Sequence, residues 1–417
     1  MNLPEDFSNY TKEIMGEELF HTLVNGLQEE PPVSIRLNPA VKEYKNPDHH
    51  THTVGWCELG QYLPQRPNFT FDPLFHAGLY YVQEASSMFI YHIIQQLVKT
   101  PVRMLDLCAA PGGKSTCCIS ALPTGSTLYC NEPIRNRAQI LSENIQKWLM
   151  CGILGKKSHS TDHLQKDIDI KVTNNYPRDY KKAKATFDII LADVPCSGEG
   201  MFRKDEGAVA EWSIYNVGKC RDLQQDIIST IWPCLRPGGI LIYSTCTFNT
   251  KENEENVRWI AEELGASFIS IPTDKEWGIT GSLLKDFNQP VYRFIPGKTK
   301  GEGLFVTVLR KERSTPLMAE KRSFSESLNI LPMDFLHSIE DSIQAPHVEL
   351  SYSQAIRYLS REALVLPPDI PKGIVVVTYR SHPIGLVKNI GNRANNLYPK
   401  EWRIRSSHLP DTQPVII

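Results

Sequence analysis

The sequence predicts an α/β protein: a doubly wound, mostly parallel sheet at its centre, a mixed α/β unit before it and a small β-rich unit after it. Residues 102–309 alternate short apolar runs with amphipathic segments, which is the pattern of strands joined by crossover helices. A chain of 417 residues also exceeds what one hydrophobic core usually supports. The composition changes again after residue 314. We therefore expect three domains, at 1–95, 96–314 and 315–417.

The first unit is expected to begin with a helix. Apolar positions recur at helical spacing over residues 7–27, and Pro31-Pro32 ends this pattern before a strand expected at 33–39. From Gly78 the chain is expected to continue into an amphipathic helix that ends near Lys99.

The central unit carries the strand and helix alternation. Strands are expected at 102–107, 126–131, 155–161, 187–193, 239–246, 266–270 and 303–309. Helices are expected at 114–122, 133–149, 223–235 and 251–264, the second of them with proline at its first position. The strand at 155–161 has the weakest pattern, and the lysine-rich stretch 171–184 is interpreted as an exposed insertion.

The last unit combines short helices with a β-rich module. Helices are expected at 323–339, with a restart at Pro332, and at 353–360, and strands at 373–379 and 383–387. Between residues 371 and 405 the chain has seven Lys or Arg against one acid, interleaved with Tyr379, Tyr398 and Trp402. Basic residues beside aromatic ones favour RNA binding by backbone contacts and base stacking. A merely solvated basic face remains the alternative.

The overall composition excludes several classes of protein. Near balance between 45 basic and 47 acidic residues excludes a uniformly basic coat for nucleic acid. Ten cysteines without a C-x-x-C pair indicate a reduced, cytoplasmic protein rather than a disulfide framework. The start lacks the pattern of a signal peptide, and no membrane span is expected. The neighbouring His49, His50 and His52 favour a solvated loop, so no metal site is expected.

A small-residue turn follows the first central strand, in the segment from Asp106 to Ser115. Cys108 stands where a P-loop requires glycine, and the dinucleotide fingerprint is absent too. Gly112 and Gly113 still let the backbone approach a ligand closely. Glu132, after the second strand, is placed like the acid that binds both ribose hydroxyls of a nucleotide, although it can equally cap the next helix. A nucleoside cofactor without pyrophosphate fits best, which indicates S-adenosylmethionine.

Two cysteines and a carboxylate follow the fourth and fifth strands. In a sheet ordered 3-2-1-4-5, the ends that carry Gly112, Asp193 with Cys196, and Cys246 are neighbours. Carbon 5 of cytosine is a poor nucleophile until a thiolate adds at carbon 6, and either thiol can serve if its pKa is lowered. Asp193 can stabilise the charge that develops at nitrogen 3. The alternative is that Cys246 is only a packed core residue, since free cysteine is often buried.

At this point the chain resembles the NOL/NOP/Sun family of RNA cytosine-C5 methyltransferases. The resemblance rests on Asp106 to Lys114, on Asp193-Val194-Pro195-Cys196-Ser197-Gly198 and on Ser244-Thr245-Cys246-Thr247. It is closest to the bacterial 16S rRNA methyltransferase F branch, through residues 80–88 and through 385–388 with 396–400. It implies a Rossmann-like class I methyltransferase core, an N-terminal RNA-contacting domain and a C-terminal PUA-like RNA-binding module.

The resemblance also implies roles for individual residues. It makes Cys246 the nucleophile and Cys196 the thiol that assists product release. The implied S-adenosylmethionine site comprises an acid after the third strand, for which Asp162 is the candidate, together with Cys108, Ala109, Ala110, Pro111, Gly112, Gly113, Lys114, Glu132 and Asp193.

The implied substrate is small-subunit rRNA, free or within an assembling subunit. Two alternatives remain open: a tRNA cytosine-C5 methyltransferase, and a non-catalytic RNA-binding ribosome assembly factor on the same fold.

Overall fold

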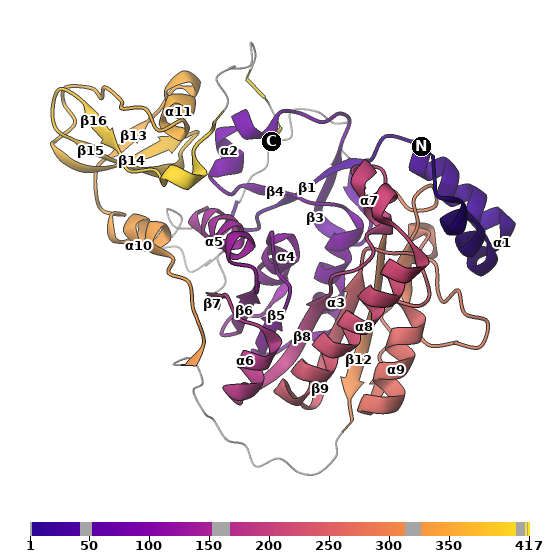
Figure 1. The fold of residues 1–417 in the computed structure, drawn as a ribbon. Helices are drawn as coiled ribbons and strands as arrows, with labels where there is room; N and C mark the ends of the chain where they lie inside the picture. Colours follow the sequence, from indigo (N-terminus) through magenta and orange to yellow (C-terminus); the bar gives the residue numbers. More distant parts are fainter. Residues whose placement is uncertain (1, 42–51, 152–166, 313–326, 406–412, 415) are drawn as a thin grey trace.

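The computed structural model describes residues 2–41, 52–151, 167–312, 327–405, 413–414 and 416–417. Its centre is an eight-stranded sheet with the strand order β10-β12-β9-β8-β5-β6-β7, and β11 pairs with β12 (Figure 1). The strands are β5 (Arg103–Asp106), β6 (Thr127–Asn131), β7 (Asp169–Thr173), β8 (Phe187–Asp193), β9 (Leu235–Thr245), β10 (Ala266–Phe268), β11 (Tyr292–Phe294) and β12 (Leu304–Lys311).

The five strands from β7 to β9 run parallel in the predicted 3-2-1-4-5 order. β12 and β10 then extend the sheet in antiparallel fashion beyond β9. β9 is therefore a central strand, and helices on both faces of the sheet explain why its sequence is a continuous apolar run. The carboxyl ends of all five parallel strands meet at one edge of the sheet.

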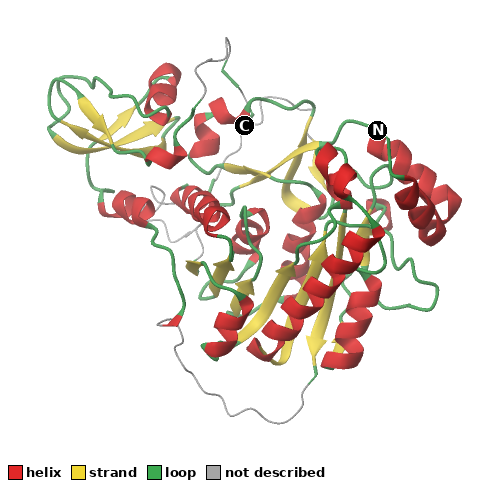
Figure 2. Ribbon diagram, in the orientation of Figure 1, coloured by secondary structure: helices red, strands yellow, loops and turns green. Residues whose placement is uncertain are grey.

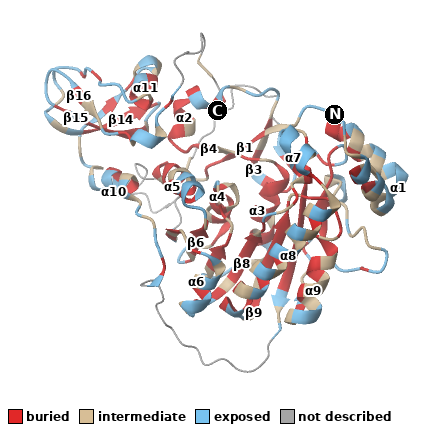
Figure 3. Cartoon of the chain, in the orientation of Figure 1, coloured by how far each residue is buried: buried red, intermediate tan, exposed pale blue. Residues whose placement is uncertain are grey.

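Helices cover both faces of this sheet, as the alternating pattern predicts. One face carries α3 (Phe89–Leu97), α4 (Gly113–Ala121) and α5 (Arg135–Met150), which pack in a row. The other face carries α6 (Pro177–Lys182), α8 (Ile214–Ile231) and α9 (Glu254–Leu264), with the short α7 (Glu206–Glu211) near the sheet edge. Figure 3 shows that buried residues fill the strands and the inward sides of these helices.

The third parallel strand lies later in the chain than predicted. β7 is Asp169–Thr173, whereas the segment expected to form this strand, 155–161, lies outside the described residues. The interpretation of 171–184 as an exposed insertion is wrong, because it contains the end of β7 and α6, with Tyr180 fully buried. Charged residues at the edge of a sheet hide the strand pattern here, since Lys171 alternates with the buried Ile170 and Val172.

Two helices also begin elsewhere than predicted. α8 begins at Ile214, nine residues before the expected start, because the Ser213 hydroxyl caps it by accepting a hydrogen bond from the amide of Asn216 at 3.1 Å. α5 begins at Arg135, so Pro133 precedes the helix instead of occupying its first position.

The leader forms a helix and a four-stranded sheet. It contains α1 (Glu5–Gln28), β1 (Val33–Leu37), β2 (His52–Val54), β3 (Cys57–Leu63), α2 (Pro73–His76) and β4 (Tyr80–Val82), with the strand order β2-β3-β1-β4. The segment after Gly78 is strand β4 and a short turn, and the helix expected there begins only at Phe89. The fully buried Arg36 of β1 donates hydrogen bonds to Gln83, Thr116 and Ser120, which ties the leader to α4.

The C-terminal module (residues 334–405) is a second small sheet with helices beside it (Figure 2). Its elements are α10 (Asp334–Asp341), β13 (His347–Glu349), α11 (Tyr352–Leu359), β14 (Gly373–Tyr379), β15 (His382–Asn389) and β16 (Ala394–Asn396), with the strand order β13-β14-β15-β16. Just before it, Leu331 donates its amide hydrogen to Val172, so the connecting segment lies along the edge strand β7.

The aromatic residues of this module do not face solvent as base stacking would require. Tyr398 is fully buried against Phe335 and Tyr358, Tyr379 is buried, and Trp402 is half-buried. The prediction that they stack on RNA bases is therefore wrong. All seven basic residues of the stretch are exposed, and the Arg380 guanidinium lies 5.8 Å from the centre of the Tyr379 ring.

None of the helices in the described part of the chain combines the length and the apolar character that a membrane span needs.

Candidate active site

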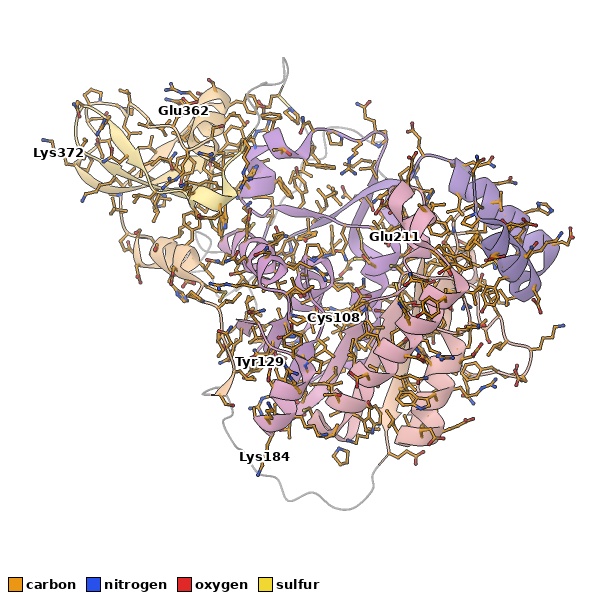
Figure 4. All side chains as sticks on the ribbon, in the orientation of Figure 1. Cys108, Tyr129, Lys184, Glu211, Glu362 and Lys372 are labelled. Carbon is orange, nitrogen blue, oxygen red and sulfur yellow. The ribbon has the colours of Figure 1, made fainter. Side chains whose placement is uncertain are left out.

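The predicted site residues gather at the carboxyl edge of the parallel strands. The small-residue turn follows β5, Asp193 ends β8, and Cys246 follows β9 directly. Figure 4 labels Cys108 in the middle of the molecule, at the end of β5. The loops after β8 and β9 touch, because the amide of Gly200 donates to the carbonyl of Cys246 at 2.8 Å.

The two thiols form a hydrogen-bonded pair. The Sγ atoms of Cys196 and Cys246 lie 3.2 Å apart, and both residues are partly exposed. The pKa of the Cys196 thiol is raised well above its usual value, first by this hydrogen bond, then by burial and by the negative charges of Cys246 and Glu252. The raised pKa favours the protonated form of Cys196.

A carboxylate and an ammonium group lie beside the thiols. The Lys114 Nζ atom lies 2.8 Å from Oδ2 of Asp193, and the Ser244 hydroxyl donates to Oδ1 at 2.8 Å. Burial by itself would lower the pKa of Lys114, but nearby negative charges, led by Asp193 and including Cys246, together raise it. Lys114 thus stays protonated and supplies a fixed positive charge that interacts with the carboxylate and with Cys246.

A glycine in the turn after β5 lets a ligand approach the backbone, and side chains from other segments hold the turn in place. Gly112 has φ 117°, a conformation that favours glycine, and a side chain there would meet Leu141 of α5. The carbonyl of Pro111 accepts hydrogen bonds from Tyr81 at 3.2 Å and from Asn144 at 2.8 Å. These two residues were not predictable from the motif, because Tyr81 comes from the leader and Asn144 from α5.

A buried carboxyl group supports the same turn from below. Asp106 is fully buried, and its Oδ2 atom accepts a 2.6 Å hydrogen bond from the hydroxyl of Ser115. Burial raises the pKa of Asp106 to about 7. Burial likewise raises the pKa of the Cys108 thiol, with the charges of Asp193 and Asp106 adding to it, so Cys108 lines the turn as a neutral thiol.

Glu132 carries an acceptor oxygen that is ready for a ligand. The side chain is only 1% exposed, and its Oε1 atom accepts a hydrogen bond from the amide of Ile134 at 3.0 Å. Its Oε2 atom accepts no hydrogen bond within the described ranges, although the Arg137 guanidinium lies 3.4 Å away. An orphaned carboxylate oxygen beside the Gly112 turn fits the hydroxyl groups of a ribose.

Asp162, the candidate for a third acid, lies outside the described residues. It precedes β7, so it does not directly follow the third strand as expected. The residues after β7 are Asn174 and Asn175. The side chain of Asn175 forms a reciprocal pair with the backbone of Asn329, donating to its carbonyl at 3.1 Å and accepting from its amide at 3.0 Å.

Two further carboxylates, Glu199 and Glu252, lie buried beneath the thiol loops. Neither was among the predicted site residues, although each follows closely after one of the cysteines. A charged residue so near a reactive one was the available signal.

Comparison with known protein families gives three matches that follow one another along the chain. The model described as 16S rRNA methyltransferase RsmB/F matches residues 97–310. The N-terminal domain of 16S rRNA methyltransferase RsmF matches residues 3–85, and the methyltransferase RsmF PUA domain matches residues 345–404.

Curated relatives carry the description ribosomal RNA small subunit methyltransferase F. The protein from Aeromonas hydrophila is 27% identical over 85% of this chain and 86% of its own length. The protein from Photobacterium profundum is 26% identical over 98% of both chains.

Solved structures share the fold. A methyltransferase homologue from Pyrococcus horikoshii matches with a TM-score of 0.58 and 22% identity, over 73% of this chain and 94% of its own. NSun6 from the same organism, solved with SFG, matches with a TM-score of 0.59 and 18% identity, over 75% of this chain and 99% of its own. Together with the PUA match, these structures confirm the predicted Rossmann-like core and PUA-like module.

Proposed function

We propose that this chain, which belongs to the 16S rRNA methyltransferase RsmB/F family, methylates carbon 5 of a cytosine in small-subunit rRNA with S-adenosylmethionine as the donor. The observation that carries the proposal is the pair of thiols 3.2 Å apart beside the Lys114–Asp193 ion pair. A single thiol at a strand end can be packing, but a hydrogen-bonded pair next to a fixed cation and a carboxylate suits nucleophilic catalysis.

Cys246 acts as the nucleophile in this proposal. Its thiolate adds to carbon 6 of the cytosine, and the electron pair of the 5,6 double bond becomes available at carbon 5 for the methyl group. A base then removes the proton from carbon 5, the double bond re-forms, and the carbon–sulfur bond breaks with Cys246 leaving as a thiolate. Cys196 assists this last step as a protonated thiol whose sulfur lies 3.2 Å from that of Cys246.

Asp193 and Lys114 hold charge at fixed positions around the base. Asp193 accepts hydrogen bonds from Lys114 and Ser244, which orient its carboxylate toward the sheet edge. From there it can share a proton with nitrogen 3 of the cytosine, where charge develops during the addition. Lys114 stabilises the negative charge on Cys246 without contacting its sulfur.

The residues of the edge fit S-adenosylmethionine. When bound, this cofactor supplies the electrophilic methyl group. Glu132 would hold the ribose through its orphaned Oε2 atom, and the backbone of the turn would contact the remainder. The residues proposed for the turn are Cys108, Ala109, Ala110, Pro111, Gly112, Gly113 and Lys114. Asp162 stays a prediction.

The C-terminal module is proposed to bind RNA through its basic surface. In this proposal the domains divide at residues 95 and 314, and the leader contacts RNA as well. Lys372, Lys388 and Arg393 gather at one end of the sheet, since Lys388 pairs in register with Ile374 and a side chain at Gly391 would meet Lys372. These cations suit phosphate contacts.

The two cysteines can be tested with single variants and a 16S rRNA transcript. Cys246→Ala should abolish methylation and give no covalent RNA adduct on a denaturing gel. Cys196→Ala should form an adduct that persists. The reverse pattern would exchange the two roles, and the absence of an adduct in both would remove the covalent mechanism.

Mapping 5-methylcytosine in total RNA with and without the protein distinguishes rRNA from tRNA as the substrate, and no change would favour a non-catalytic assembly factor.

A further inference from the structure

Two buried carboxylates connect the loops that carry the thiols. The Cys196 loop (residues 194–200) follows β8, and the Cys246 loop (residues 246–253) follows β9. Glu199 belongs to the first loop and Glu252 to the second, and both are almost completely buried. Burying a carboxylate is unfavourable unless hydrogen bonds compensate for the lost water, so the partners of these two groups indicate their role.

Each carboxylate binds the backbone of the opposite loop. Glu199 accepts hydrogen bonds through Oε2 from the amides of Phe248 and Asn249, in the Cys246 loop. Glu252 accepts through Oε2 at 3.1 Å from the amide of Ser197, the residue directly after Cys196. These three bonds cross, because the carboxylate from one loop holds backbone amides of the other.

Asn249 joins the two carboxylates. Its side-chain nitrogen donates to Glu199 at 2.9 Å and to Glu252 at 2.8 Å, and its side-chain oxygen accepts from the amide of Glu252 at 2.9 Å. Gln224 adds a further donor to Glu252 at 2.7 Å. We call Glu199, Asn249 and Glu252 the crossed clamp.

The carboxylates of the crossed clamp also affect the pKa values of nearby groups. Burial raises the pKa of Glu252 to about 7, and the nearby charge of Glu199 adds to this effect. Glu252 in turn contributes to the raised pKa of Cys196. The carboxylate that fixes the backbone after Cys196 thus also favours the protonated form of that thiol.

We propose that Glu199 and Glu252 are positioning residues with separate tasks, Glu199 fixing Cys246 for attack and Glu252 fixing Cys196 for release of the product. This inference rests on the proposed function, since it assigns the carboxylates to two steps of that reaction. The assignment follows from the crossing: Glu199 holds amides of the Cys246 loop, and Glu252 holds the amide that follows Cys196. An error of about 1 Å in placing a reacting group slows a step by roughly 10²-fold.

Glutamine variants test this division without changing side-chain volume. All the groups that face Glu199 and Glu252 in these bonds are donors, so an amide nitrogen in place of one oxygen meets them unfavourably. Single-turnover experiments with a labelled 16S rRNA transcript and S-adenosylmethionine give the rate of adduct formation. A chase with unlabelled transcript gives the rate of adduct decay.

Glu252→Gln should slow decay by about tenfold or more while formation stays within about threefold, and Glu199→Gln should do the reverse. Glu262→Gln, an exposed glutamate on α9, is the matched control and should change neither rate. Equal slowing of both steps by both variants, or no change in either, would overturn the inference. If Glu252→Gln does not fold, Asn249→Ala, which removes the bridge, should slow both steps, and unchanged rates would likewise overturn it.

The double variant Cys196→Ala with Glu252→Gln separates positioning from a structural effect. If Glu252 acts through Cys196, the double variant should decay no more slowly than Cys196→Ala alone. Additive slowing would show that Glu252 acts elsewhere. Cys196→Ala serves also as the internal reference: no adduct in that variant contradicts the proposed function, whereas a normal adduct there with unchanged glutamate variants contradicts only the crossed clamp.

Discussion

The catalytic edge and the C-terminal module distribute polar and apolar groups in opposite ways. At the catalytic edge, Asp106, Glu132 and Glu252 are buried while the reactive thiols stay partly exposed. In the module, the aromatic rings of Tyr379 and Tyr398 are buried, and every basic residue of the stretch 371–405 is exposed. Charged side chains are therefore buried at the catalytic edge and exposed in this stretch of the module.

The difference shows which sequence patterns carry information about chemistry. An exposed charge next to buried residues is a common product of strand folding, as in β15, where Lys388 is exposed between the buried Val387 and Asn389. Buried carboxylates are different, because a carboxylate is retained in a core only where bonds or function compensate for its desolvation. The module's pattern is explained by folding alone, whereas that of the edge is not.

The largest expected effect tests the assignment of Tyr398 to the core. Tyr398→Ala should destabilise the module by about 3–5 kcal/mol, because it empties a site enclosed by Phe335, Tyr358 and Trp402. Thermal or urea unfolding measures the change, and Leu397→Ala, at a more exposed neighbour, is the control. A variant of unchanged stability with weakened RNA binding would restore the stacking role and remove the contrast between the regions.

The next effect tests the charge at the catalytic edge. Lys114→Met should lower the rate of methylation by about 10²–10³-fold, because it removes the fixed positive charge that faces Asp193 and Cys246. Single-turnover methylation measures the loss, and equilibrium binding of S-adenosylmethionine shows whether the cofactor still binds. A methylation rate close to that of the wild type would mean that this ion pair is structural.

Much of this fold was predictable because local patterns and tertiary structure agree in it. Phe187–Asp193 is a strand with the predicted bounds, and the thiols meet because parallel strands end at one edge. β7 was missed because an edge strand tolerates Asp169 and Lys171, which conceal its apolar face.

The side chains that hold the site in place by hydrogen bonds were harder to predict from the sequence. Tyr81, Asn144 and Asn329 reach the cofactor edge from three distant segments, and the crossed clamp depends on which loop each glutamate turns toward. Spacing in the sequence predicts which residues share a sheet edge. It does not predict the hydrogen bonds of the side chains between them.

A smaller effect tests the exposed charges of the module. Replacing Lys372, Lys388 and Arg393 by Gln should raise the dissociation constant for RNA about 30-fold at low salt, because three phosphate contacts are lost. The matched control replaces Lys181, Lys182 and Lys184, an equal exposed charge at another end of the molecule; Figure 4 labels Lys372 and Lys184 far apart. Titrations at several salt concentrations compare the two variants. Equal losses would indicate a general effect of net charge and no RNA site on the module.

The last effect depends on pH and tests the buried carboxyl group beneath the turn. The pKa of Asp106 is raised to about 7 by burial, above its usual value near 4, so between these pH values the folded state binds a proton that the unfolded state has released. Its contribution to stability is therefore present at low pH and is lost as the pH rises through about 7, by at most about 1.4 kcal/mol per pH unit. In Asp106→Asn this loss should disappear, so the variant should gain stability relative to the wild type from pH 5 to pH 8.

Thermal unfolding across that range measures the difference, with Asp369→Asn in the module as the exposed control. Parallel curves for Asp106→Asn and the wild type would show that the catalytic edge stores no such charge, and the contrast with the module would then rest on Glu132 and Glu252 alone.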